Sequence, residues 1–196
     1  TEGRSGSGRQ LPNNFTNTAG VVFRVTSGQV NPAATCFLGA ESFMTGATPI
    51  ALVSQAAGAR CPKQRYPQFQ ADKGRPVVAC WPIAESSTGI QVTMIEFARR
   101  LTHALASLVV IDQETRIYVD YPAEFNGPGA DLWRSDDGGE IHPERFEMVF
   151  LLKRGPDYLL AINWSGAEGS VLSLLSAAGG NQFKELISDS WYRSPF

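Results

Sequence analysis

The chain has 196 residues, of which 43% are hydrophobic and 18% charged, and its formal net charge is -2. This composition excludes a disordered chain, and the near-neutral charge argues against a nucleic-acid-binding domain, which usually carries a strongly basic face. Because 19 glycines and 12 prolines favour short buried strands joined by tight turns, we predict one mainly β domain, either an antiparallel sheet or a sandwich or barrel, with an α+β fold as the alternative.

The first residues differ from the rest of the chain. Residues 1–10 contain no apolar side chain, so we predict a flexible tail over residues 1–12 and a single globular domain over 13–196. The sequence does not begin with methionine, which fits removal of a signal peptide and equally fits a trimmed cytosolic protein. No apolar run approaches the ~20 residues that a membrane-spanning helix needs.

Strand-like segments dominate the first half of the chain. Short runs rich in β-branched and aromatic residues, bounded by Gly, Pro, Asn or Ser, predict strands over residues 21–26, 35–38 and 49–54. Residues 76–83 and 90–97 follow, and Ser-Ser-Thr-Gly at 86–89 supplies a turn between them. We therefore predict a hairpin, whose second strand has both faces partly apolar.

Residues 96–107 carry apolar side chains at helical spacing, yet strand signals flank them, so both a helix and a long strand are open. The alternating segment 116–121 predicts a strand with Ile117, Val119 and Tyr121 facing inward. Residues 122–144 read as a long loop, and residues 146–153 and 158–164 as a second hairpin around the Arg-Gly-Pro-Asp turn at 154–157.

The C-terminal part is predicted to end in a helix, unlike the strand-like segments before it. Residues 170–178 form an apolar run that ends at two glycines. Asn181 then offers an N-cap, and Phe183, Leu186, Ile187 and Trp191 recur at a spacing that places them on one helical face. We predict a short helix over residues 182–192.

Cysteine usage is asymmetric, because Cys36, Cys61 and Cys80 all lie in the first 80 residues. A Cys61–Cys80 disulfide would close a loop of about twenty residues and leave Cys36 as a free thiol; that is the pairing we predict. Pairings of Cys36 with either other cysteine, or three reduced buried thiols, are the alternatives. A disulfide would indicate a periplasmic or extracellular protein.

The stretch between Cys61 and Cys80 is basic and carries two aromatic rings. Arginine and lysine supply charge and aromatic rings supply flat stacking surface, so a loop of this kind can bind an anion, a glycan or a partner protein. The alternative is a solvated loop whose rings pack back onto the core. The predicted binding residues are Lys63, Arg65, Tyr66, Phe69, Lys73 and Arg75.

A second candidate lies in the predicted loop before residue 144, where carboxylates are dense. Oxygen ligands at this density can gather Ca²⁺, although the spacing does not match an EF-hand, and an ordinary acidic loop is the alternative. No other cofactor is predicted. The predicted metal ligands are Asp131, Asp136, Asp137, Glu140 and His142.

No catalytic motif occurs in the sequence. The chain has two histidines, and it contains no nucleophile elbow, P-loop or dinucleotide-binding fingerprint. We predict a non-enzymatic, exported binding module whose surface loops contact a protein or a polymeric ligand, with no nucleic acid and no membrane span. Two alternatives are a metal-dependent hydrolase that combines the acidic loop with His103, and a structural subunit of a larger assembly.

Overall fold

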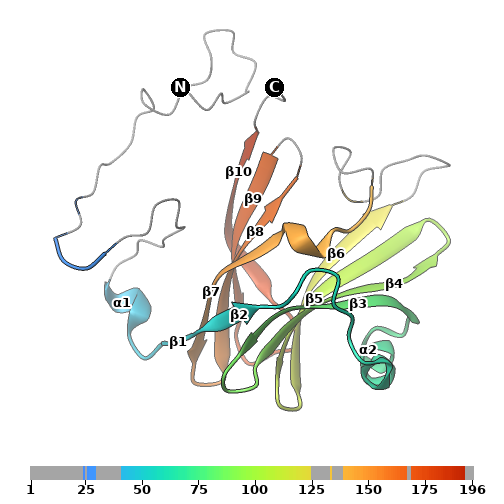
Figure 1. Cartoon of the computed structure of the whole chain (residues 1–196), viewed down its shortest axis with the longest axis horizontal. Helices are drawn as coiled ribbons and strands as arrows, with labels where there is room; N and C mark the ends of the chain where they lie inside the picture. Colours follow the sequence, from blue (N-terminus) through green and yellow to red (C-terminus); the bar gives the residue numbers. More distant parts are fainter. Residues whose placement is uncertain are drawn as a thin grey trace, which may run out of the picture.

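The computed structural model describes residues 24, 26–29, 41–124, 133, 139–166 and 169–192, and these residues form two antiparallel five-stranded sheets (Figure 1). The first sheet has the order β1-β7-β8-β9-β10 and the second the order β2-β3-β4-β5-β6. Strands of the first sheet are β1 (Thr48–Ile50), β7 (Phe146–Arg154), β8 (Asp157–Ser165), β9 (Gly169–Ala177) and β10 (Lys184–Tyr192). Strands of the second are β2 (Leu52–Ser54), β3 (Val77–Ser86), β4 (Gln91–Arg100), β5 (His103–Asp112) and β6 (Thr115–Glu124).

One extended segment joins the two sheets. Only Ala51 separates β1 from β2, so the chain pairs with β7 in one sheet and, directly afterwards, with β3 in the other. At the opposite side, Tyr118 of β6 forms an isolated parallel bridge with Gln182, which lies just before β10. The predicted single β-rich domain is confirmed.

The main core lies between the sheets. Successive side chains of a strand point to opposite faces of its sheet, so every second residue faces the other sheet. Its fully or nearly fully buried members include Val92, Met94, Leu108, Val110, Leu151, Leu160 and Ile162.

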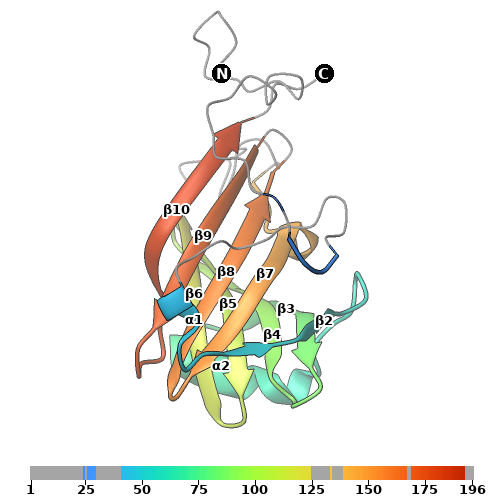
Figure 2. The same cartoon turned by 90° about the vertical axis from the view of Figure 1, so that its left-hand side faces the viewer.

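A second cluster, called here the outer cluster, covers the other face of the β2–β6 sheet. Helix α2 (Tyr66–Lys73) lies against that face, as Figure 1 and Figure 2 both show. Because the helix covers it, this sheet is buried on both faces, which explains why the predicted strand at 90–97 is apolar on both sides. The outer cluster consists of Cys61, Phe69, Cys80, Ile95, Phe97, Val109 and Tyr118.

Three short helices complete the described elements: α1 (Glu41–Met44), η2 (Lys63–Arg65) and η4 (Pro143–Arg145). Helix α2 replaces what the sequence suggested was a loop. Pro67 occupies its first turn, and Gly74 ends it in the left-handed conformation with φ 61°. Proline at a helix start and glycine after its end are the sequence signals for these boundaries.

The structure confirms most predicted strands where it describes them. Residues 49–54 form β1 and β2, both predicted hairpins are present, and residues 116–121 lie within β6. The ambiguous stretch 96–107 is strand, split between the end of β4 and the start of β5. The predicted tail and the predicted strand 35–38 lie outside the described residues, as do most of the predicted strand 21–26 and most of the predicted loop 122–144.

The predicted C-terminal helix is wrong, because these residues form β10, which pairs with β9. A β-bulge between Glu185 and Ile187 inserts one residue into the strand. The bulge shifts the alternation of faces, so the apolar side chains of an irregular strand acquire a spacing that resembles that of a helix.

Candidate functional site

The disulfide fixes the segment between β2 and β3. Cys61 and Cys80 are bonded, with their Cα atoms 5.3 Å apart, which confirms the predicted pairing. The Cys61 N–H also donates to the Cys80 carbonyl at 3.0 Å. The chain that leaves β2 is therefore tied back to the edge of β3 at residue 61.

Between these attachments the chain bows away from β3. The Gln55 N–H donates to the Ile83 carbonyl at 2.8 Å, and the next described bond to this edge is that of Cys61. Residues 55–60, called here the bowed loop, are small or polar and mostly exposed. The Ala59 N–H donates to the Ala56 carbonyl at 3.2 Å, and Gly58 adopts a φ of 80°, so the loop turns sharply at its centre.

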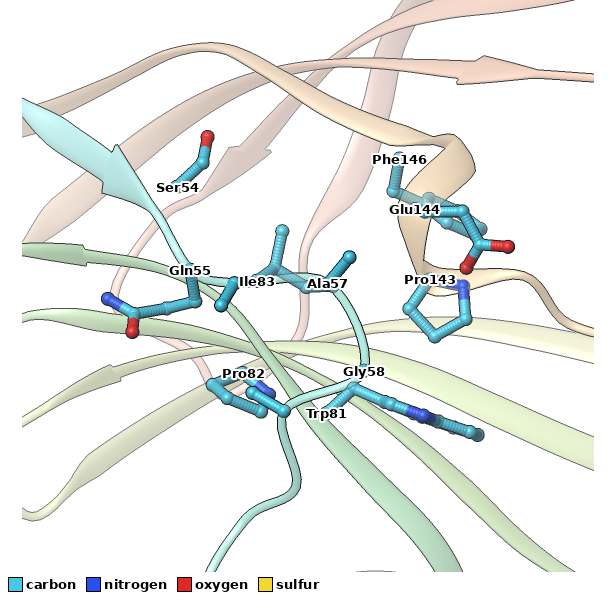
Figure 3. A pocket seen from close by; sticks show the side chains of 12 residues that line it. Ser54, Gln55, Ala57, Gly58, Trp81, Pro82, Ile83, Pro143, Glu144 and Phe146 are labelled. Carbon is cyan, nitrogen blue, oxygen red and sulfur yellow. The ribbon is translucent and has the colours of Figure 1, made fainter.

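A cavity of about 280 Å³ lies beneath the bowed loop. Figure 3 shows Gln55 at one side of this cavity, Pro143 and Glu144 at the other, and Trp81 below them. We call this cavity the cleft. It is lined by Ser54, Gln55, Ala56, Ala57, Gly58, Ala59, Trp81, Pro82, Ile83, Pro143, Glu144 and Phe146.

Trp81 is held in position by β4, by the main core and by Arg60 of the bowed loop. Its strand, β3, pairs it with Met94 of β4, and its half-buried ring packs against the main core. The Arg60 guanidinium lies 4.5 Å from the ring centroid in a cation–π contact. Arg60 does not line the cleft, so the indole meets the cleft with another part of its surface.

Among the described residues that line the cleft, Glu144 is the one with an ionisable side chain. It belongs to η4, and its side chain is 62% exposed. Nδ1 of His142 lies 3.3 Å from Glu144 Oε1. The carboxylate is therefore oriented by a neighbour yet still accessible to a bound molecule.

An aromatic cluster lies behind the cleft. The rings of Phe146 and Trp164 stack with centroids 5.0 Å apart, and Tyr121 meets both edge-on at 5.3 and 5.2 Å. The Trp133 indole N–H donates to the Tyr121 carbonyl at 2.9 Å. Burial raises the pKa of the Tyr121 phenol above its usual value, so this residue is neutral at physiological pH. The wall that Phe146 contributes is therefore rigid and uncharged.

A second cavity of about 270 Å³ lies on the other side of the bowed loop. Gln55 and Pro82 line both cavities, and the second is completed by residues that include Cys61, Arg65 and Gln91. Arg65, one of the predicted binding residues, donates to the Gln91 side chain. The bowed loop thus has a hollow on each side of it.

Two other hollows in the described part of the chain have different characters. The larger, of about 390 Å³, lies among hairpin turns, where Lys153 Nζ and Asp112 Oδ2 are 2.6 Å apart and neutralise each other. The other, of about 310 Å³, lies between β6 and β10. Neither combines an exposed carboxylate with a tryptophan, as the cleft does.

Three of the six predicted binding residues are engaged within the fold. Phe69 is 1% exposed and belongs to the outer cluster, so its ring offers no stacking surface. Lys73 Nζ lies 2.6 Å from Asp120 Oδ2 and 4.1 Å from the Tyr118 ring centroid. Arg65 bonds to Gln91, as described above. The rings therefore pack onto the core, which was the alternative interpretation of this stretch.

The other three predicted binding residues lie nearer the surface. Lys63 is exposed, and Tyr66 is half-buried against the outer cluster. An Nη1 of Arg75 donates to the His103 carbonyl at 3.3 Å. None of the three lines any of the four hollows described above.

The predicted metal site falls mostly outside the described residues, which include Glu140 and His142 but not Asp131, Asp136 or Asp137. Burial raises the pKa of the Glu96 carboxyl, and the charge of Glu140 acts on it in the same direction. Within the described ranges, no three His, Cys, Asp or Glu side chains are grouped as they would be to hold a metal ion.

The comparisons with known proteins give no family: no family model, no curated protein and no solved structure matches this chain. Among the helices that the structure describes, none is long and apolar enough to cross a membrane. The function must therefore be argued from the site itself.

Sequence reasoning missed the cleft because its lining comes from three segments that are far apart in the chain. One available signal was the Trp-Pro pair at 81–82, since proline inside a strand marks an edge or a bulge. A register shift between Pro82 and Ala84 is present at this point. Small residues at 56–59 were a second signal, because they leave space beside a large ring.

Proposed function

We propose that this protein is a non-enzymatic binding module, exported to the periplasm or the cell exterior, which holds a protein or polymeric ligand in the cleft. The observation that carries the proposal is that Trp81 and Glu144 both line one open hollow of the β scaffold. Aromatic surface with a few placed polar groups is the usual composition of a ligand site. The disulfide supports an oxidising compartment.

A binding role is favoured over catalysis by the contents of the cleft. Among the described residues its lining includes one ionisable group, whereas hydrolysis by a carboxylate pair needs two carboxylates in defined positions. His103 lies beside Glu124, 4.0 Å from its carboxylate, and His142 lies beside Glu144, so the histidines pair with different carboxylates.

The test compares Trp81→Ala with Tyr66→Ala in the full-length protein. Both substitutions remove a half-buried ring, but Tyr66 belongs to the α2 surface and Trp81 to the cleft. Immobilised wild-type protein and both variants are offered panels of oligosaccharides and peptides, after circular dichroism has shown that each variant is folded.

We expect Trp81→Ala to weaken retention of any bound panel member at least tenfold, and Tyr66→Ala to leave it within twofold. The bound member is recovered chemically unchanged. If Tyr66→Ala loses binding while Trp81→Ala keeps it, the ligand lies on α2. If the bound panel member is chemically converted, the protein is an enzyme.

A further inference from the structure

We infer that the ligand of the cleft is a neutral carbohydrate, one ring of which rests against Trp81. This inference rests on the proposed function and narrows its ligand class. It is based on the shape, the charge and the polar groups of the cleft.

The indole supplies the surface that a sugar ring needs. A pyranose presents C–H groups on one face, and these pack against the electron-rich face of an aromatic ring. Trp81 is fixed by β3 and by Arg60, so it loses little conformational freedom when a ligand binds. The adjacent walls of Ala57, Pro82 and Pro143 are apolar.

The polar groups of the cleft suit hydroxyl groups. A carboxylate offers two acceptor oxygens to hydroxyl donors. Figure 3 shows the carboxylate of Glu144 at one side of the hollow, whereas the amide of Gln55, at the other side, is directed away from Trp81. A hydroxyl group of a sugar ring that lies over Trp81 can therefore donate to Glu144.

The charge of the cleft disfavours anions. Glu144 is the one acidic side chain among the described lining residues, and the Arg60 guanidinium faces the indole instead of lining the hollow. A phosphate, a sulfated polymer or a nucleic acid would bring its negative charge beside this carboxyl group. A neutral ligand avoids this repulsion.

The edge of β3 disfavours a peptide that adds as a strand. Strand addition requires free backbone donors and acceptors along an edge. The carbonyls of Ile83 and Cys80 already accept from Gln55 and Cys61. Pro82, between them, has no N–H to donate. Recognition must therefore use side chains, which suits a sugar better than an extended peptide.

The size of the cleft fits one ring unit. Its volume of about 280 Å³ lies just below the range of about 300–1,000 Å³ that is usual for sites of drug-sized ligands. The cleft is therefore large enough for one sugar residue, and the remainder of a chain would lie along the exposed bowed loop.

The experiment titrates the full-length protein with neutral oligosaccharides of glucose, mannose, xylose and N-acetylglucosamine. A proline-rich peptide and heparin are titrated alongside, and tryptophan fluorescence and calorimetry are the readouts. The variants are Trp81→Ala, Trp81→Phe and Glu144→Ala, with Tyr66→Ala as the matched control.

We expect at least one neutral oligosaccharide to bind, with affinity that changes less than twofold between 50 and 500 mM salt, because a neutral ligand displaces no counterions. Trp81→Ala should weaken it at least tenfold and Glu144→Ala three- to tenfold, whereas Trp81→Phe should retain part of the affinity. Tyr66→Ala should leave it unchanged.

The two proposals fail in different ways. If the peptide or heparin binds with dependence on Trp81 and no neutral oligosaccharide does, the carbohydrate inference is overturned while the cleft remains a binding site. If the probes that bind are insensitive to Trp81→Ala, or none of them binds, both proposals are rejected.

Discussion

Phe69 shows how one buried side chain can attach an otherwise polar segment to a sheet. It comes from a stretch rich in charge and proline, yet its ring is 1% exposed and packs in the outer cluster. Asp72 on the same helix accepts from Arg116 Nε at 2.6 Å and from the Tyr118 hydroxyl. One buried ring and several charged hydrogen bonds therefore hold α2 against the β2–β6 sheet.

Phe69→Ala is therefore expected to lower the free energy of unfolding by about 3–5 kcal/mol, the usual cost of removing a buried phenylalanine ring. Urea denaturation measures it, and Phe69→Leu is the milder variant if the alanine protein does not fold. Val78→Ala on β3, where the side chain is 59% exposed, is the control and should cost well under 1 kcal/mol. A loss below about 1 kcal/mol for Phe69→Ala would contradict the position of α2.

Asp112 makes stability depend on pH. Hydrogen bonds from Lys153 Nζ, at 2.6 Å, and from the Tyr158 hydroxyl hold the pKa of this carboxyl below its ordinary value of 3.8. A carboxyl whose folded pKa lies below its unfolded pKa stabilises the fold above the unfolded value. That contribution is lost as the pH falls through the folded pKa.

Asp112→Asn should therefore lower the free energy of unfolding by about 1–2 kcal/mol at pH 7. It should also make the decline of this free energy below pH 4 shallower. Urea denaturation from pH 2 to 7 gives the comparison, with Glu114→Gln in the adjacent exposed turn as the control. Asp72, whose pKa the Arg116 hydrogen bond lowers, accounts for part of the remaining decline. An unchanged pH profile in Asp112→Asn would show that the ion pair does not form.

Among the elements, the bowed loop has one end that is fixed by a covalent bond. It pairs with β3 at its two ends, and residue 61 is held by the disulfide to Cys80. Closing a loop of this length restricts the unfolded chain and stabilises the fold by about 3 kcal/mol.

Replacing both Cys61 and Cys80 by serine should lower unfolding free energy by about 3 kcal/mol and increase amide hydrogen exchange at residues 55–61. The wild-type protein, denatured without reductant, should show one thiol by mass spectrometry after alkylation, because Cys36 is the third cysteine. Three alkylated thiols would contradict the disulfide.

The elements also show what sequence reasoning could reach. Strand β6 follows from clear alternation, and strands β7 and β8 follow from two apolar runs with good turn residues between them. Helix α2 was missed because its polar residues bond to the sheet across 44 to 47 positions in sequence, which no local pattern shows. Strand β10 was mistaken for a helix because its bulge breaks the alternation. The disulfide was predictable because one pairing enclosed a segment of low apolar content.

At the scale of the whole molecule, the cleft depends on how the sheets are joined. Because β1 and β2 are one extended segment, the bowed loop begins where that segment leaves β3, and η4 leads into β7 on the other side. The two sheets therefore contribute opposite walls of one hollow. No local sequence pattern could have brought residues 55, 81 and 144 together.

Chemical-shift mapping by NMR tests the central claim most directly, namely that the cleft is where this protein holds its ligand. Isotope-labelled full-length protein is titrated with whichever panel member binds. We predict that the largest amide shifts fall in residues 55–59, 81–83 and 143–146, with α2 and residues 63–65 little affected. Largest shifts on α2 and residues 63–65, with the three cleft segments unchanged, would contradict the account.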